Sequence, residues 1–172
     1  MNRFLFLLTG FFMQVSVLTA QDIFEASRKG DITRIEQLTK INRDTVNAHD
    51  ANGFTPLIIA GYRGQKDVVT YLLQAGADIN ASSPEGTVLL GVCYKGNTEV
   101  AKLLLDHKAD VNARNQQGTT ALMFAVHSDN SDLVKLLLKA GAKKDVEDKS
   151  GKTALDYAKM IHSSEIISLL SE

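Results

Sequence analysis

The sequence has 172 residues, of which 44% are apolar and 6% aromatic, so one domain with a mainly aliphatic core is expected. The formal net charge is -1 and no long run of one sign occurs, unlike the strongly basic face of a typical nucleic-acid binder. The single cysteine, Cys93, excludes an internal disulfide, a multi-cysteine zinc site and a CxxC redox pair.

Residues 1–20 have the pattern of a signal peptide. Arg3 supplies the positive start, residues 4–8 and 11–13 supply an apolar stretch, and Ala20 is the small residue before the predicted cleavage point. The stretch is short for a membrane span, which needs about 20 apolar residues. We therefore expect a periplasmic or secreted protein. An uncleaved membrane anchor and a helix packed on the domain are the alternatives.

The rest of the chain contains an internal repeat. Four segments align, at residues 52–80, 85–112, 117–145 and 150–171. The spacing from Leu122 to Leu155 is 33 residues, and the second unit lacks the residue that would lie between Gly86 and Thr87. Residues 22–38 are a weaker match to the same pattern and are predicted to be the N-terminal cap. A fixed period of this length indicates a stacked-repeat architecture.

Each unit is predicted to contain two helices. A threonine precedes the first apolar run in every unit, where its hydroxyl can cap free backbone N–H groups: Thr55, Thr87, Thr120 and Thr153. Small residues in the first helix allow close packing: Ala60, Ala125 and Ala158. Leu104 and Leu137 lie on the apolar stripe of the second helix and are expected in the core. Gly76 and Gly141 end that helix, and Lys108 in their place predicts a strained positive φ.

The segment from Thr55 to Asn80, with its Thr-Pro-Leu start and its Gly-Ala-Asp-Ile-Asn end, resembles the ankyrin repeat. This resemblance implies an all-α repeat fold, an ankyrin-repeat solenoid of stacked helix-turn-helix units with β-hairpin loops. The predicted divisions within the domain, residues 21–172, are a cap at 22–46, repeats at 47–79, 80–111 and 112–144, and a C-terminal cap at 145–172. The family's loop-tying histidine is replaced by Ile58, Leu90, Met123 and Asp156.

The polar residues give no sign of catalysis or metal binding. The four histidines fall at different phases of the repeat, whereas a metal site needs converging ligands: His49, His107, His127 and His162. Cys93 is interpreted as a small core residue, and no phosphate-binding or nucleophile motif occurs. We therefore expect no enzyme activity, no metal and no cofactor.

The resemblance implies that hairpins and first helices form a concave surface on which a partner protein docks. The partner-binding residues predicted on it are Phe54, Tyr62, Arg63, Tyr94, Lys95, Arg114 and His127. Tyr62, Tyr94 and His127 share one phase and should form a row, with Arg63 and Lys95 beside it. The alternative is that these rings only cover the seam between helices.

The predicted function is a non-catalytic protein-protein interaction module, expected to be a monomer, that acts outside the cytoplasm. The expected type is an exported bacterial ankyrin protein, with membrane contact only through an uncleaved signal segment. An immunity-type inhibitor of a toxin or enzyme and a passive structural spacer are the alternatives.

Overall fold

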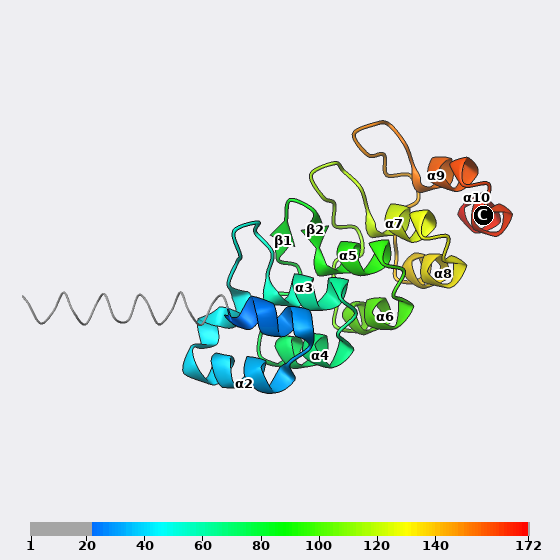
Figure 1. Ribbon diagram of the computed structural model, residues 1–172. Helices are drawn as coiled ribbons and strands as arrows, with labels where there is room; N and C mark the ends of the chain where they lie inside the picture. The colour runs from blue at the N-terminus through cyan, green and yellow to red at the C-terminus, as the bar shows by residue number, and fades with distance from the viewer. Residues whose placement is uncertain (1–21, 172) are drawn as a thin grey trace, which may run out of the picture.

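The computed structural model describes residues 22–171, so the predicted signal peptide lies outside the described residues. The helices occur in pairs that stack side by side, and the hairpin loops project from one edge of the stack (Figure 1). After helical residues 22–29, the elements are α2 Ile32–Ile41, η1 Arg43–Asn47, α3 Pro56–Tyr62, α4 Lys66–Gln74, β1 Ser82–Ser83, β2 Gly86–Thr87, α5 Val88–Tyr94, α6 Thr98–Asp106, α7 Ala121–His127, α8 Ser131–Lys139, α9 Ala154–Met160 and α10 Ser164–Ser171.

Two rows of helices make up the solenoid. The first helices α3, α5, α7 and α9 contact one another in order, and the second helices α4, α6, α8 and α10 form the row behind them (Figure 1). One such pair cannot bury its own apolar face, so neighbouring pairs supply the missing contacts. The structure confirms the predicted all-α repeat fold.

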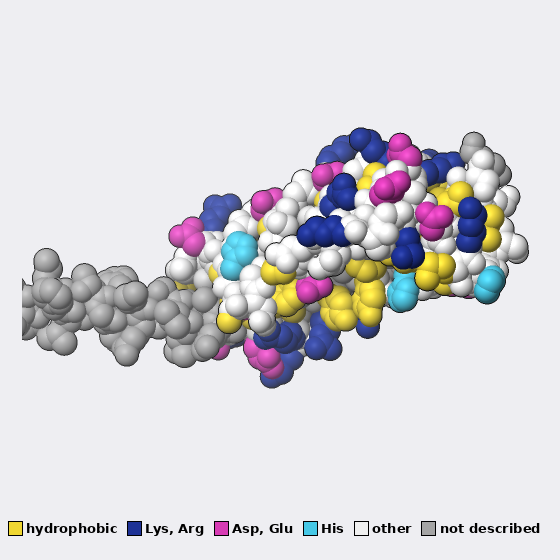
Figure 2. Space-filling view, turned by 90° about the horizontal axis from the view of Figure 1, so that it is seen from above, with side chains coloured by type: hydrophobic (Ala, Val, Ile, Leu, Met, Phe, Trp, Pro, Cys, Tyr) yellow, Lys and Arg dark blue, Asp and Glu magenta, His cyan; other side chains and the backbone are white. Residues whose placement is uncertain are grey.

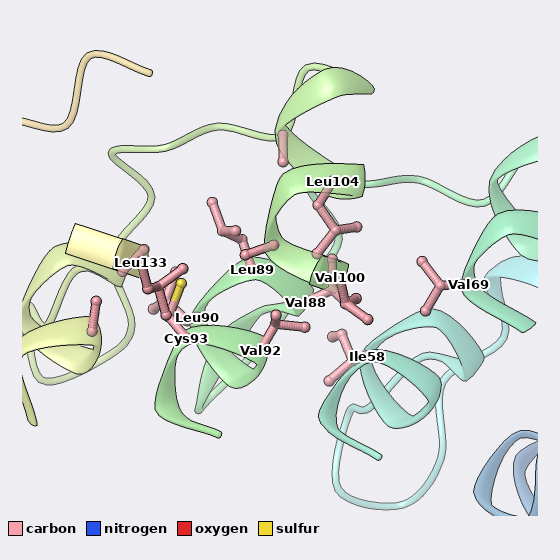
Figure 3. Close-up of a cluster of buried hydrophobic side chains, with 14 of the residues drawn as sticks. Ile58, Val69, Val88, Leu89, Leu90, Val92, Cys93, Val100, Leu104 and Leu133 are labelled. Carbon is pink, nitrogen blue, oxygen red and sulfur yellow. The ribbon is translucent and has the colours of Figure 1, made fainter. Parts of the chain in front are cut away.

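The core consists of the small and aliphatic residues that the repeat phase predicted. Ala60, Ala125 and Ala158 are fully buried, as are Leu104 and Leu137. Figure 3 shows side chains of the second unit between those of its neighbours, with Leu133 of the third unit on one side and Ile58 and Val69 of the first unit on the other. The core predictions are therefore confirmed.

Three first helices begin as the threonine pattern predicts. The hydroxyl of Thr55 accepts a hydrogen bond from the N–H of Ile58 at 3.2 Å, and Thr120 and Thr153 make the equivalent bond. The prediction is wrong for Thr87, whose hydroxyl is buried without a hydrogen-bond partner among residues 22–171. The hairpin of the second unit is one residue shorter, and Thr87 lies in its strand β2, paired with Ser82.

The end of each second helix requires a left-handed residue. Gly76 and Gly141 have φ values of 95° and 91°, and Lys108 has φ 68° at the equivalent place. The predicted positive φ of Lys108 is confirmed, and this conformation costs a residue with a Cβ about 1 kcal/mol or more.

Asparagines connect neighbouring units at the base of the hairpins. The side-chain oxygen of Asn47 accepts from the N–H of Asp78 at 2.8 Å, and Asn80 and Asn112 repeat this bond one and two units later. This asparagine series ties the loops together although the family's loop-tying histidine is absent.

Candidate partner-binding site

An aromatic row runs across the first helices. Tyr62, Tyr94 and His127 are the last residues of α3, α5 and α7, so the repeat brings them together. The ring centroids of Tyr62 and Tyr94 are 6.4 Å apart with an interplanar angle of 11°, and those of Tyr94 and His127 are 6.0 Å apart at 8°. The tyrosines are 41% and 46% exposed. The predicted row is therefore present, and its rings stack in parallel.

Two cations lie beside the row. Lys95 places its Nζ 5.0 Å from the ring centroid of Tyr62, within the range of a cation–π interaction. Arg63 follows Tyr62 at the C-terminal end of α3 and is exposed. Neither side chain forms an ion pair within the described part of the chain. Both charges are available to an anionic group of a partner.

A pocket of about 480 Å³ adjoins the tyrosines. We call it the second-unit pocket because its floor includes Leu90 and Gly91 of α5. Its apolar walls come from three consecutive units: Phe54, Ile58, Ile59, Tyr62, Tyr94 and Phe124. In the view from the hairpin side, hydrophobic side chains gather along one edge, midway along the molecule, with basic side chains beside them (Figure 2).

Phe54 and Phe124 lie deeper than the tyrosines. Phe54 is half-buried and packs against the core while lining the pocket. Phe124 meets the ring of Tyr94 edge-on, with centroids 5.5 Å apart and planes at 83°. Sequence reasoning did not select Phe124, although its phase in α7 matches Ile59 in α3 and so indicates the same face.

Arg114 has a different environment. Its guanidinium donates to the carbonyl oxygen of Gly118 at 3.1 Å and to that of Glu147 in the next hairpin. It does not line the second-unit pocket. Its donors therefore connect the hairpins of the third and fourth units, a role that the sequence analysis did not predict.

The buried thiol and the ion pairs between second helices, all within residues 22–171, lie outside the aromatic row. Cys93 is fully buried, and burial raises the pKa of its thiol well above the usual range, which disfavours the nucleophilic thiolate. No group of three or more metal-ligating side chains converges in residues 22–171. The salt bridges Lys66–Glu99 and Lys135–Glu165 join second helices, away from the aromatic row. None of the described helices is long and apolar enough to cross a membrane.

Comparison with known proteins agrees with the architecture. The family model for ankyrin repeats in three copies matches residues 23–83 and 89–172. Ankyrin repeat domain-containing protein 29 is 39% identical over 61 residues in Danio rerio, covering 36% of this chain and 20% of that protein. The human protein of that name is 38% identical over 61 residues, with the same coverage.

Palmitoyltransferase akr1 of Emericella nidulans is 31% identical over 70 residues, which cover 41% of this chain and 10% of that enzyme. This match is between repeats and carries no evidence of acyl transfer. The chain thus spans a fifth or less of the length of these relatives, which come from animals and a fungus. Ankyrin repeats generally mediate protein–protein interaction. Because the family model covers most of the sequence, this chain belongs to the ankyrin-repeat family.

Proposed function

We propose that this protein is a non-catalytic binding module that holds a partner protein on the face formed by its hairpins and first helices. The observation that carries the proposal is the exposed stack of Tyr62, Tyr94 and His127 beside two cations without ionic partners in residues 22–171. Aromatic and arginine side chains dominate the energy of many protein interfaces because they bury large areas at low entropic cost. The buried thiol and the dispersed histidines support a function without catalysis.

The proposal includes action outside the cytoplasm, in the periplasm or a secreted location. Its support is the sequence of residues 1–20, with Arg3, an apolar stretch and Ala20 in the order of a signal peptide. N-terminal sequencing of the protein recovered from its native source should begin at or near Gln21. A cytoplasmic product that retains Met1 would contradict export and would leave the binding proposal unaffected.

The binding proposal is tested by replacing the exposed rings. A partner captured from the extracellular or periplasmic fraction should bind the Tyr62→Ala/Tyr94→Ala double variant at least 1–2 kcal/mol more weakly, about five- to thirtyfold. Urea unfolding should change little because both side chains are more than two-fifths exposed. The matched control is Tyr62→Phe/Tyr94→Phe, which keeps both rings and should keep most of the affinity.

The two alternatives, rings that only cover the helix seam and a protein that is a passive spacer, predict different results from those of a binding face. If the rings only cover the seam between helices, the double alanine variant loses stability while its folded fraction binds as well as wild type. A passive spacer captures no partner in stoichiometric amount. Either result would remove this face as the binding site.

A further inference from the structure

The second-unit pocket results from two departures of the second unit from its neighbours. Gly91 of α5 occupies the position that Ile59 has in α3 and Phe124 has in α7. No side chain from this position therefore lies between those of Ile59 and Phe124. The second unit also lacks the residue between Gly86 and Thr87, which is the counterpart of Phe54 in the first hairpin. Both departures lie at the pocket, because its lining includes Gly91, Gly86 and Phe54.

Close packing between helices does not explain why residue 91 is a glycine. A Cβ built there would meet Tyr62 at 3.6 Å, which is ordinary van der Waals contact, and the backbone φ is not positive. Gly61 differs, since a Cβ there would lie 2.4 Å from a methyl group of Val88, so close helix approach explains that glycine. The hollow at Gly91 therefore has no packing explanation within the described structure.

The rim of the pocket carries a positive excess on its helix side. Arg28 and Asp50 pair with each other at 3.4 Å, so their charges offset. Arg63 lines the pocket, and Lys95 lies over the Tyr62 ring that forms its wall. Glu85, at the hairpin side, is the remaining acid among the lining residues. The two helix-side cations leave the rim with a net charge complementary to a carboxylate.

We propose that the second-unit pocket receives one large apolar side chain, aromatic or aliphatic, from an acidic segment of the partner protein. The inference rests on the proposed function and specifies the partner's chemistry. The four aromatic side chains of the lining provide contacts for this apolar side chain, which we call the anchor, and the absence of a side chain at Gly91 provides the space. A carboxylate next to the anchor meets Arg63 and Lys95, and the rest of the segment lies along the ring stack toward His127.

The probe is a phage-displayed library of random linear peptides, selected on the folded wild-type protein. Enriched sequences should carry an aromatic or large aliphatic residue with Asp or Glu nearby. Their affinity should fall as salt increases, because exposed charge pairs are screened. Enrichment of basic or purely polar sequences would overturn the proposal.

The decisive variant is Gly91→Leu, which fills the pocket from its floor. A selected peptide should bind it at least tenfold more weakly, while the urea midpoint does not fall, because leucine is a better helix former than glycine. The control is Met160→Ala, which removes an exposed apolar side chain at the position in α9 that corresponds to Tyr62 and Tyr94, outside the pocket lining. Equal losses in both variants would overturn the pocket as the anchor site.

The outcomes separate this inference from the proposed function. If Tyr62→Ala/Tyr94→Ala weakens the captured partner and Gly91→Leu does not, the face binds the partner but the pocket proposal fails. If neither variant changes affinity, both proposals fail. A concentration-dependent dimer that Gly91→Leu disrupts would make a second copy of this chain the occupant, and the acidic-segment proposal would be wrong.

Discussion

Thr55 and Thr87 occupy equivalent places before α3 and α5, yet replacing each with valine should change stability in opposite directions. Both residues are buried, at 1% and 6% exposure, and valine keeps the branched shape, so neither change opens a cavity. Thr55 accepts from the N–H of Ile58, whereas the buried hydroxyl of Thr87 has no partner in the described residues.

The expected magnitudes follow from these contacts. Loss of the Thr55 cap costs about 0.5–2 kcal/mol, and the upper half of that range applies because Ile58 is buried and its N–H is left unpaired. Removing an unpaired buried hydroxyl relieves part of a desolvation cost of about 1–3 kcal/mol, so Thr87→Val should be neutral to about 1 kcal/mol more stable. The two variants should therefore differ by about 2 kcal/mol.

Urea unfolding followed by far-UV circular dichroism measures this difference. Thr87→Ser is the control, because it keeps the hydroxyl, removes the methyl group and should be less stable than wild type. If Thr87→Val loses as much stability as Thr55→Val, the Thr87 hydroxyl has a partner in solution, and the reasoning from the shortened hairpin is refuted.

Three further predictions concern stability. Leu137→Ala should cost about 2–5 kcal/mol in urea unfolding, and the half-buried neighbour Leu138→Ala clearly less. Lys108→Gly should relieve about 1–2 kcal/mol of left-handed strain and lose about 0.4–1 kcal/mol to unfolded-chain entropy, so its urea midpoint should rise. The hydroxyl of Tyr157 donates to Asp148 and holds the pKa of that carboxyl below its usual range, so this contribution is complete at pH 7. The stability difference between wild type and Tyr157→Phe should therefore shrink in acid titrations as the pH falls below about 4.

Periodicity explains what could be predicted from the sequence. A fixed repeat places equivalent residues at equivalent positions in space, so the phase alone aligned Tyr62, Tyr94 and His127 and identified Leu104 and Leu137 as core. These properties depend on regular helix geometry, which the spacing of apolar residues along the sequence indicates.

The features that escaped prediction depend on where one unit differs from the others. The hydrogen bonds from Arg114 to two hairpin carbonyl groups were not predicted, because loop conformation determines them. Thr87 was expected to cap a helix, but its hydroxyl has no hydrogen-bond partner in the described residues, and its hairpin is one residue shorter than the others. The second-unit pocket depends on a residue that is missing and on a glycine, and neither leaves a side chain for a pattern search to find.

Grafting the third hairpin onto the second unit tests whether one missing residue explains both the uncapped helix and the pocket. Replacing residues 83–87 with a copy of residues 115–120 supplies the absent counterpart of Phe54, together with the asparagine that accepts two loop N–H groups in the third hairpin. With a hairpin of full length, the threonine before α5 should cap the helix and raise the free energy of unfolding by about 1 kcal/mol in urea.

The added residue should also narrow the pocket from the hairpin side, so peptides selected on wild type should bind the graft several-fold more weakly. The reverse graft, with residues 83–87 copied over 115–120, is the control. It should lower stability by removing the Thr120 cap, but it should create no second peptide site, because Phe124 still fills the place that Gly91 leaves open in α5. Peptide binding by the reverse graft at the third unit would mean that the short hairpin alone makes the pocket, and the role assigned to Gly91 would be wrong.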